Sequence, residues 1–64
     1  MDKREDRLLR IRAVVERVGM SRATIYRKIA RGEFPKSVGV GGQSVRWRAS
    51  VIEAWMQSLV PRSD

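Results

Sequence analysis

Residues 18–32, VGMSRATIYRKIARG, decide the fold. Gly19 ends one apolar-patterned segment and Ser21 opens the next, with only Met20 between them. Glycine reaches the left-handed conformation that ends a helix, and a serine hydroxyl accepts hydrogen bonds from the first turn of a new helix. So short a link favours two crossed helices over a relaxed antiparallel hairpin. This stretch therefore predicts a helix-turn-helix.

The second helix is predicted to begin at Ser21, to run through Arg22 to Ala30 and to end near Arg31, with Gly32 as its cap. Ile25 and Ile29 are four residues apart, so they share one side of this helix. We expect that side to pack on the preceding helix. The other sides are polar and cationic.

The first helix is predicted from Arg12 to Val18, because Val14, Val15 and Val18 fall on one face. That face is expected to receive the two isoleucines. Upstream, residues 7–11 are either a short extended segment laid across the core or a lead-in to this helix. Both alternatives fit the pattern.

A hairpin is predicted after the second helix. Phe34 is expected to fill the core, and Pro35 biases it toward an extended backbone. Residues 37–40 and 44–48 alternate in character around the turn Gly41-Gly42-Gln43. In the second strand Val45 and Trp47 share one face, whereas Arg46 and Arg48 share the other.

The last helix is predicted to open at Ser50, which forms a capping-box spacing with Glu53, and to end at Pro61. Its predicted core stripe is Ile52, Trp55, Met56 and Leu59. The order helix, helix, hairpin, helix predicts a mainly α fold with a small β-hairpin, a winged helix-turn-helix. One domain is expected over residues 7–60, with disordered tails at 1–6 and 61–64.

Composition excludes several classes of protein. The 64 residues include no histidine and no cysteine, which excludes zinc fingers, thiol nucleophiles, Ser-His triads and disulfides. No paired carboxylates offer acid–base chemistry or a hard-metal site, and so small a chain leaves no room for an enclosed substrate pocket. We expect no enzyme, no metal, no cofactor and no small-molecule substrate. No apolar run approaches about 18 residues and no signal peptide is recognisable, so a cytoplasmic protein without a membrane partner is predicted.

Charge indicates the partner. Fourteen Lys and Arg against seven Asp and Glu give a net charge of +7, and eleven of the fourteen are Arg. The stretch from Arg17 to Arg48 contains eight basic residues and a single acidic one, Glu33. Such a local excess favours a polyanion, and Arg makes bidentate contacts to phosphate and guanine. Double-stranded DNA is the predicted partner. RNA is disfavoured because no exposed aromatics are grouped for base stacking.

The predicted DNA-binding residues lie on the second helix and the hairpin. The second helix would read bases in the major groove, and the hairpin would contact backbone phosphates or the minor groove. The alternatives without DNA binding are that the second helix is an ordinary solvated surface helix and that the hairpin is purely structural. Tyr26 could pack at the core edge with its hydroxyl on a phosphate, or be purely structural. The full set is Ser21, Arg22, Ala23, Thr24, Tyr26, Arg27, Lys28, Arg31, Lys36, Gly41, Gly42, Gln43, Arg46 and Arg48.

The stretch from Val14 to Leu59 resembles the AlpA family of phage-type regulators. The resemblance is carried by residues 18–27, 32–36, 45–48 and 51–55, which read VGMSRATIYR, GEFPK, VRWR and VIEAW. It implies a fold related to MerR-type and excisionase winged helices, and a bacterial or prophage transcription regulator. It also implies that Ser21, Arg22, Thr24, Tyr26 and Arg27 fall in the recognition-helix motif, and Gly41 and Gly42 in the wing turn. Family members often begin the first helix with Pro-Glu, where this chain has Arg12-Ala13.

The predicted function is sequence-specific binding of double-stranded DNA by a phage or mobile-element regulator. A homodimer or a cooperative array on repeated sites is expected, because one small module covers a short half-site. Two alternatives remain: an excisionase-type factor that bends DNA for recombination, and a small antiactivator that binds a protein. The second would use Val51 and Val60, which lie off the core stripe.

Overall fold

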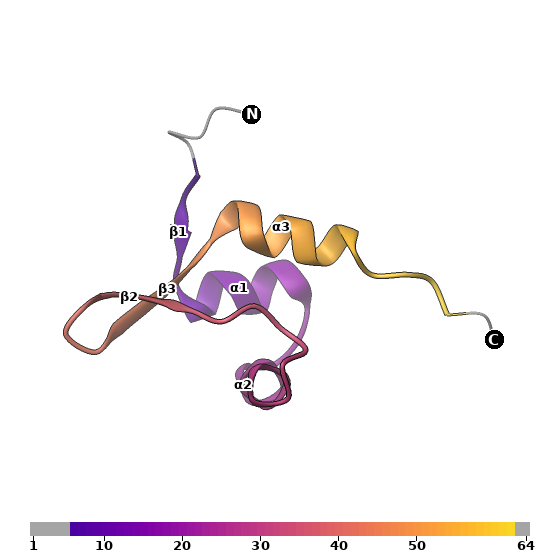
Figure 1. Cartoon of the computed structure of the whole chain (residues 1–64), viewed down its shortest axis with the longest axis horizontal. Helices are drawn as coiled ribbons and strands as arrows, with labels where there is room; N and C mark the ends of the chain where they lie inside the picture. The colour runs from indigo at the N-terminus through magenta and orange to yellow at the C-terminus, as the bar shows by residue number, and fades with distance from the viewer. Residues whose placement is uncertain (1–5, 63–64) are drawn as a thin grey trace.

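The computed structural model describes residues 6–62, so the tails predicted at residues 1–5 and 63–64 lie outside the described part. Three helices and three short strands form a mainly α fold with a β-hairpin, as predicted for a winged helix-turn-helix (Figure 1). The elements are β1 (Leu8–Leu9), α1 (Ile11–Val18), α2 (Arg22–Ala30), β2 (Val38–Gly41), β3 (Ser44–Arg48) and α3 (Ala49–Gln57).

The helix-turn-helix forms through the two expected signals. Gly19 adopts a left-handed φ of 75° and its N–H donates to the Val15 carbonyl at 2.9 Å, which ends α1. The Ser21 hydroxyl then accepts from the Thr24 N–H at 3.2 Å and caps α2. Helix α2 spans Arg22–Ala30 with Arg31 as its C-cap, within one residue of the predicted bounds, and Gly32 follows with a left-handed φ of 74°. Local sequence therefore fixes the link between these helices.

The segment before α1 is extended, as one of the two alternatives for residues 7–11 predicts, although Ile11 already begins the helix. Strand β1 pairs antiparallel with β3, with Leu9 opposite Trp47, and the sheet order is β1-β3-β2. The Ala49 N–H donates to the Arg7 carbonyl at 2.8 Å, so this ladder runs directly into α3. The N-terminal strand thus ties the wing to the last helix.

The core lies between the helices and the inner face of the sheet. Trp47 is 1% exposed, and its ring Nε1–H donates to the Pro35 carbonyl at 3.0 Å. Trp55 Nε1–H donates to the Glu33 carbonyl at 3.2 Å, and its ring lies 4.6 Å from that of Phe34. The link from α2 to the hairpin is therefore held by two indoles. The buried core consists of Leu9, Val14, Ile25, Phe34, Trp47 and Ile52.

The predicted capping box at Ser50 is wrong. Helix α3 starts at Ala49, and the Ser50 N–H and hydroxyl both donate to the Asp6 carboxylate, at 2.9 and 2.8 Å. Asp6, which sequence assigned to the tail, supplies the cap from across the fold. Glu53 instead pairs with Arg17 of α1 at 3.1 Å. The Asp6 carboxylate therefore caps α3 in place of the predicted Glu53 carboxylate.

The predicted end of α3 is also wrong. The helix stops at Gln57, with Ser58 as its C-cap, and the Ser58 hydroxyl donates to the Trp55 carbonyl at 2.6 Å. Leu59 therefore leaves the helix and is 56% exposed rather than core. Pro61 lies beyond the helix and does not terminate it.

Candidate nucleic-acid interface

Helix α2 lies on one side of the molecule with its outer surface uncovered. Figure 1 shows it end-on, with α1 between it and α3. Ile25 is fully buried and Ile29 packs partly against the core, as the sequence predicts. These two anchors fix the rotation of the helix and so decide which side chains face out.

The outward stripe of α2 consists of small and cationic residues. At about 100° per residue, Ala23, Arg27, Ala30 and Arg31 lie opposite the Ile25 side, and all four are exposed. Arg27 stands between two alanines, whose small side chains leave it room to reach outward. Ala30 was not among the predicted site residues, although the spacing of Ile25 and Ile29 in the sequence already places it on this side of the helix.

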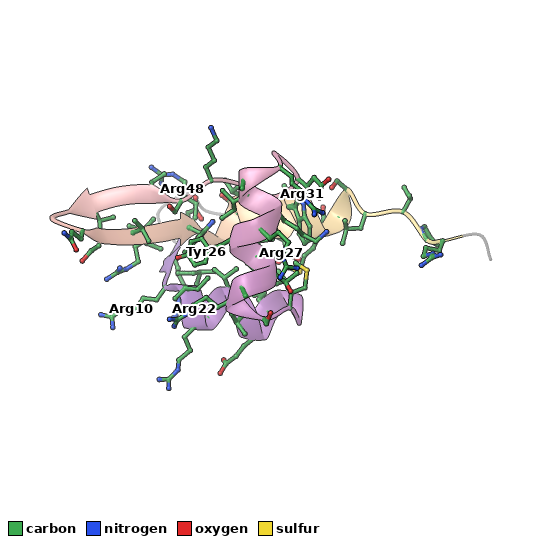
Figure 2. All side chains as sticks on the ribbon, turned by 90° about the horizontal axis from the view of Figure 1, so that it is seen from below. Arg10, Arg22, Tyr26, Arg27, Arg31 and Arg48 are labelled. Carbon is green, nitrogen blue, oxygen red and sulfur yellow. The ribbon has the colours of Figure 1, made fainter. Side chains whose placement is uncertain are left out.

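The two flanks of α2 differ. Arg22 and Tyr26 lie on the hairpin flank, and Figure 2 shows Arg27 and Arg31 on the other side of the helix axis. Thr24 is partly buried, and its Oγ1 lies 3.0 Å from the Ser21 hydroxyl. Those two hydroxyls therefore serve the helix cap first. Of the predicted residues on α2, the arginines are the least engaged by the protein.

Lys28 is also partly engaged. Its Nζ lies 3.9 Å from the Glu33 carboxylate, and the two side chains are 36% and 52% exposed. At that distance and exposure the pair is screened by water and weakly held. Lys28 is thus a weaker candidate than its neighbour Arg27, whose guanidinium makes no hydrogen bond or ion pair within residues 6–62.

Tyr26 sits at the edge of the core. Its ring centroid lies 6.2 Å from that of Trp47 at an interplanar angle of 61°, an edge-on contact. Its side chain is nevertheless 43% exposed. Tyr26 therefore joins α2 to the wing strand β3 while part of its ring stays in solvent. The core-edge placement is confirmed, and the phosphate contact stays a prediction.

The hairpin presents a glycine tip and a cationic edge. Gly41 and Gly42 have φ of 123° and 56°, and the turn residues are exposed. Arg48 and Lys36 are exposed as well, whereas Arg46 is partly buried and its guanidinium donates to the Val45 carbonyl at 2.8 Å. The tip and Arg48 are open to a ligand, and Arg46 is partly occupied by its own strand.

Arg10 is a cation that the sequence did not single out. It lies between β1 and α1, is exposed, and projects on the hairpin side of α2 with Arg22 and Tyr26 (Figure 2). Only the pairing of β1 with β3 brings it there, so no local signal could have found it. Five arginines and Tyr26 are thus seen from the α2 side of the molecule: Arg10, Arg22, Arg27, Arg31 and Arg48.

Other kinds of site have little support. Within residues 6–62, no group of three acidic, histidine or cysteine residues is placed to hold a metal ion. No helix in that range has the length and apolar character needed to cross a bilayer. The distinctive feature of the surface is therefore its arginine side.

Comparison with known proteins shows the family of the chain. The sequence profile of the family described as "Prophage CP4-57 regulatory protein (AlpA)" matches residues 7–60. A phage P4 protein, "Uncharacterized protein ORF88", is 46% identical over 59 residues, which cover 92% of this chain and 67% of the relative. The "DNA-binding transcriptional activator AlpA" of Escherichia coli K12 is 41% identical over 56 residues, 78% of this chain and 80% of the relative. No solved structure gives a significant match. The chain therefore belongs to the AlpA family of prophage regulatory proteins.

Proposed function

We propose that this chain is a sequence-specific regulator of transcription that binds double-stranded DNA with α2 in the major groove and the hairpin on the adjacent backbone. The observation that carries the proposal is the uncovered outer stripe of α2, where Arg27 stands exposed between Ala23 and Ala30. The Escherichia coli relative is named a DNA-binding transcriptional activator, which supports the same class of activity.

Arg27 is the residue best placed to read a base. The major groove admits an α-helix, and a guanidinium donates to guanine O6 and N7 together. The alanines on either side let the helix backbone come close to the base edges, so Arg27 can reach the floor of the groove. Such a bidentate pair discriminates between bases by about 1–3 kcal/mol. Arg31, one turn further on, extends the same stripe.

The remaining cations serve affinity. Arg22 on the hairpin flank and Arg48 on β3 lie off the outer stripe, where the phosphates bordering the groove would run. The Tyr26 hydroxyl and the glycine tip complete the backbone contact. If about five phosphates are neutralised, log K falls with log salt at a slope near −4.5. A module of this size covers one short half-site, so paired or cooperative binding to repeated sites follows.

The experiment compares two arginine variants on a site selected from a random duplex library. Arg27→Ala should lower the preference for the selected site over a version with one altered guanine, by about 5- to 150-fold. The matched control is Arg17→Ala, because Arg17 carries the same charge but is held against Glu53 of α3 at 3.1 Å. It should keep that preference. Equal losses of specific and non-specific affinity in Arg27→Ala would overturn base reading by α2.

A further inference from the structure

Arg10 occupies a fixed position at the junction of β1 and α1. Its backbone is extended, with φ −77° and ψ 164°, and its carbonyl accepts from the Val14 N–H at 3.1 Å. Leu9 on one side is 7% exposed and pairs with Trp47, and Ile11 on the other packs against the core. Two apolar neighbours therefore hold the backbone while the Arg10 side chain stays in solvent.

No acid compensates this charge within residues 6–62. The Arg10 guanidinium takes part in no hydrogen bond or ion pair there, and the nearest acid in sequence that the structure describes, Asp6, is bound by Ser50. Figure 2 shows the Arg10 side chain pointing away from the protein, below the hairpin and on the Arg22 side of α2. The guanidinium groups of Arg10 and Arg22, which lie on the same flank of α2, repel each other unless an anion lies beside them.

We infer that Arg10 binds a backbone phosphate of the DNA and that the contact surface extends from α2 and the hairpin to the β1–α1 junction. The inference rests on the proposed DNA binding. A phosphate is the fitting ligand because Arg10 lies off the outer stripe of α2, on the side where the backbone bordering the groove would pass. Phosphate contacts position a protein without reading sequence. Arg10 therefore adds affinity and fixes register, and leaves base preference alone.

The test measures how DNA affinity depends on salt. Loss of one phosphate contact in Arg10→Ala should make the slope of log K against log salt shallower by about 0.9, and Arg10→Lys should restore it. Arg12→Ala is the matched control. It removes the same charge from an exposed residue in the first turn of α1, whereas Arg10 precedes that helix, and it should leave the slope as in the wild type. Thermal melting of each variant excludes loss of fold as the cause.

Ethylation interference then locates the contact. Ethylation of the phosphate that Arg10 contacts should weaken DNA binding by the wild-type protein. Ethylation of the same phosphate should not weaken DNA binding by Arg10→Ala any further. An unchanged slope in Arg10→Ala, or an equal change in Arg12→Ala, would refute the inference. Failure of the proposed function looks different: the wild-type chain itself would show no salt-dependent binding to any duplex.

Discussion

Asp6 shows how far a single side chain can act from its place in the sequence. Its carboxylate accepts from the Ser50 N–H and hydroxyl and so satisfies the first turn of α3. These two hydrogen bonds, and then the positive charge of Arg48, hold the pKa of Asp6 below its ordinary value of 3.8. The ionised form is therefore favoured by the folded state.

The prediction at this residue is a pH-dependent loss of stability. Because the folded pKa is depressed, the contribution of Asp6 is fully present well above pH 3.8 and is lost as the pH falls through the lower folded value. Asp6→Ala should melt at a lower temperature than the wild type at neutral pH. The difference between the two melting temperatures should shrink on acidification below the ordinary value. Thermal unfolding followed by circular dichroism measures both. A difference that stays constant with pH would argue against the cap.

Ser50→Ala provides the companion measurement. It deletes the hydroxyl donor but keeps the backbone N–H that also bonds Asp6. Its melting temperature should fall less than that of Asp6→Ala. Because Ser50 lies at the start of α3, away from α2, DNA affinity of the folded protein should be unchanged.

At the scale of elements, the hairpin turn places its two glycines in different backbone conformations. Gly41 at φ 123° lies in a region that L-residues rarely enter, whereas Gly42 at φ 56° lies in the left-handed region that asparagine tolerates. A Cβ at either position meets open space, so only backbone strain opposes substitution.

Gly41→Ala should therefore destabilise the protein by about 1–3 kcal/mol, and Gly42→Asn should cost much less. Chemical denaturation at equilibrium gives the two free energies of unfolding. Gly42→Asn should also keep its affinity for DNA at the hairpin tip. Equal destabilisation by the two substitutions would mean that turn conformation is not what selects glycine here.

The sequence predicts the elements that depend on neighbouring residues and misses those that depend on residues far away in the chain. Gly19, Ser21 and the Ile25–Ile29 spacing act within one or two turns of chain, and the structure confirms the helix-turn-helix that they predict. The Ser50 capping box was predicted from equally local reasoning and is wrong, because Asp6 arrives through the β1–β3 ladder. Spacing cannot report a competitor that lies over forty residues away.

The candidate site divides in the same way. The arginines of α2 follow from periodicity, and their exposure agrees with it. Arg10 could not be found, since it joins this side of the molecule only when Leu9 pairs with Trp47. Leu59 fits the apolar spacing of α3, yet the helix has ended at Gln57 before it. Periodicity therefore predicts which face a residue would take, and not whether the element reaches it.

For the whole molecule, Trp47 joins three parts of the fold in one contact. Its indole N–H bonds the Pro35 carbonyl, its ring touches Tyr26 of α2, and its backbone pairs with β1. The hairpin, α2 and the N-terminal strand thus share one buried side chain. In a chain of 64 residues such a junction carries a large part of the stability.

Trp47→Ala should consequently leave the free chain largely unfolded. Truncating a buried tryptophan costs about 3–5 kcal/mol, and a domain of this size has about 3–10 kcal/mol in total. Duplex DNA that binds only the folded form should restore structure, because ligand at about 100 times its Kd contributes about 2.7 kcal/mol. Circular dichroism with and without the selected duplex tests both steps. Heparin, a polyanion without base pairs, is the control: if it restores as much structure as the duplex, charge neutralisation alone explains the effect. A cooperative melt near the wild-type temperature without DNA would show that α1, α2 and α3 hold together independently of the wing.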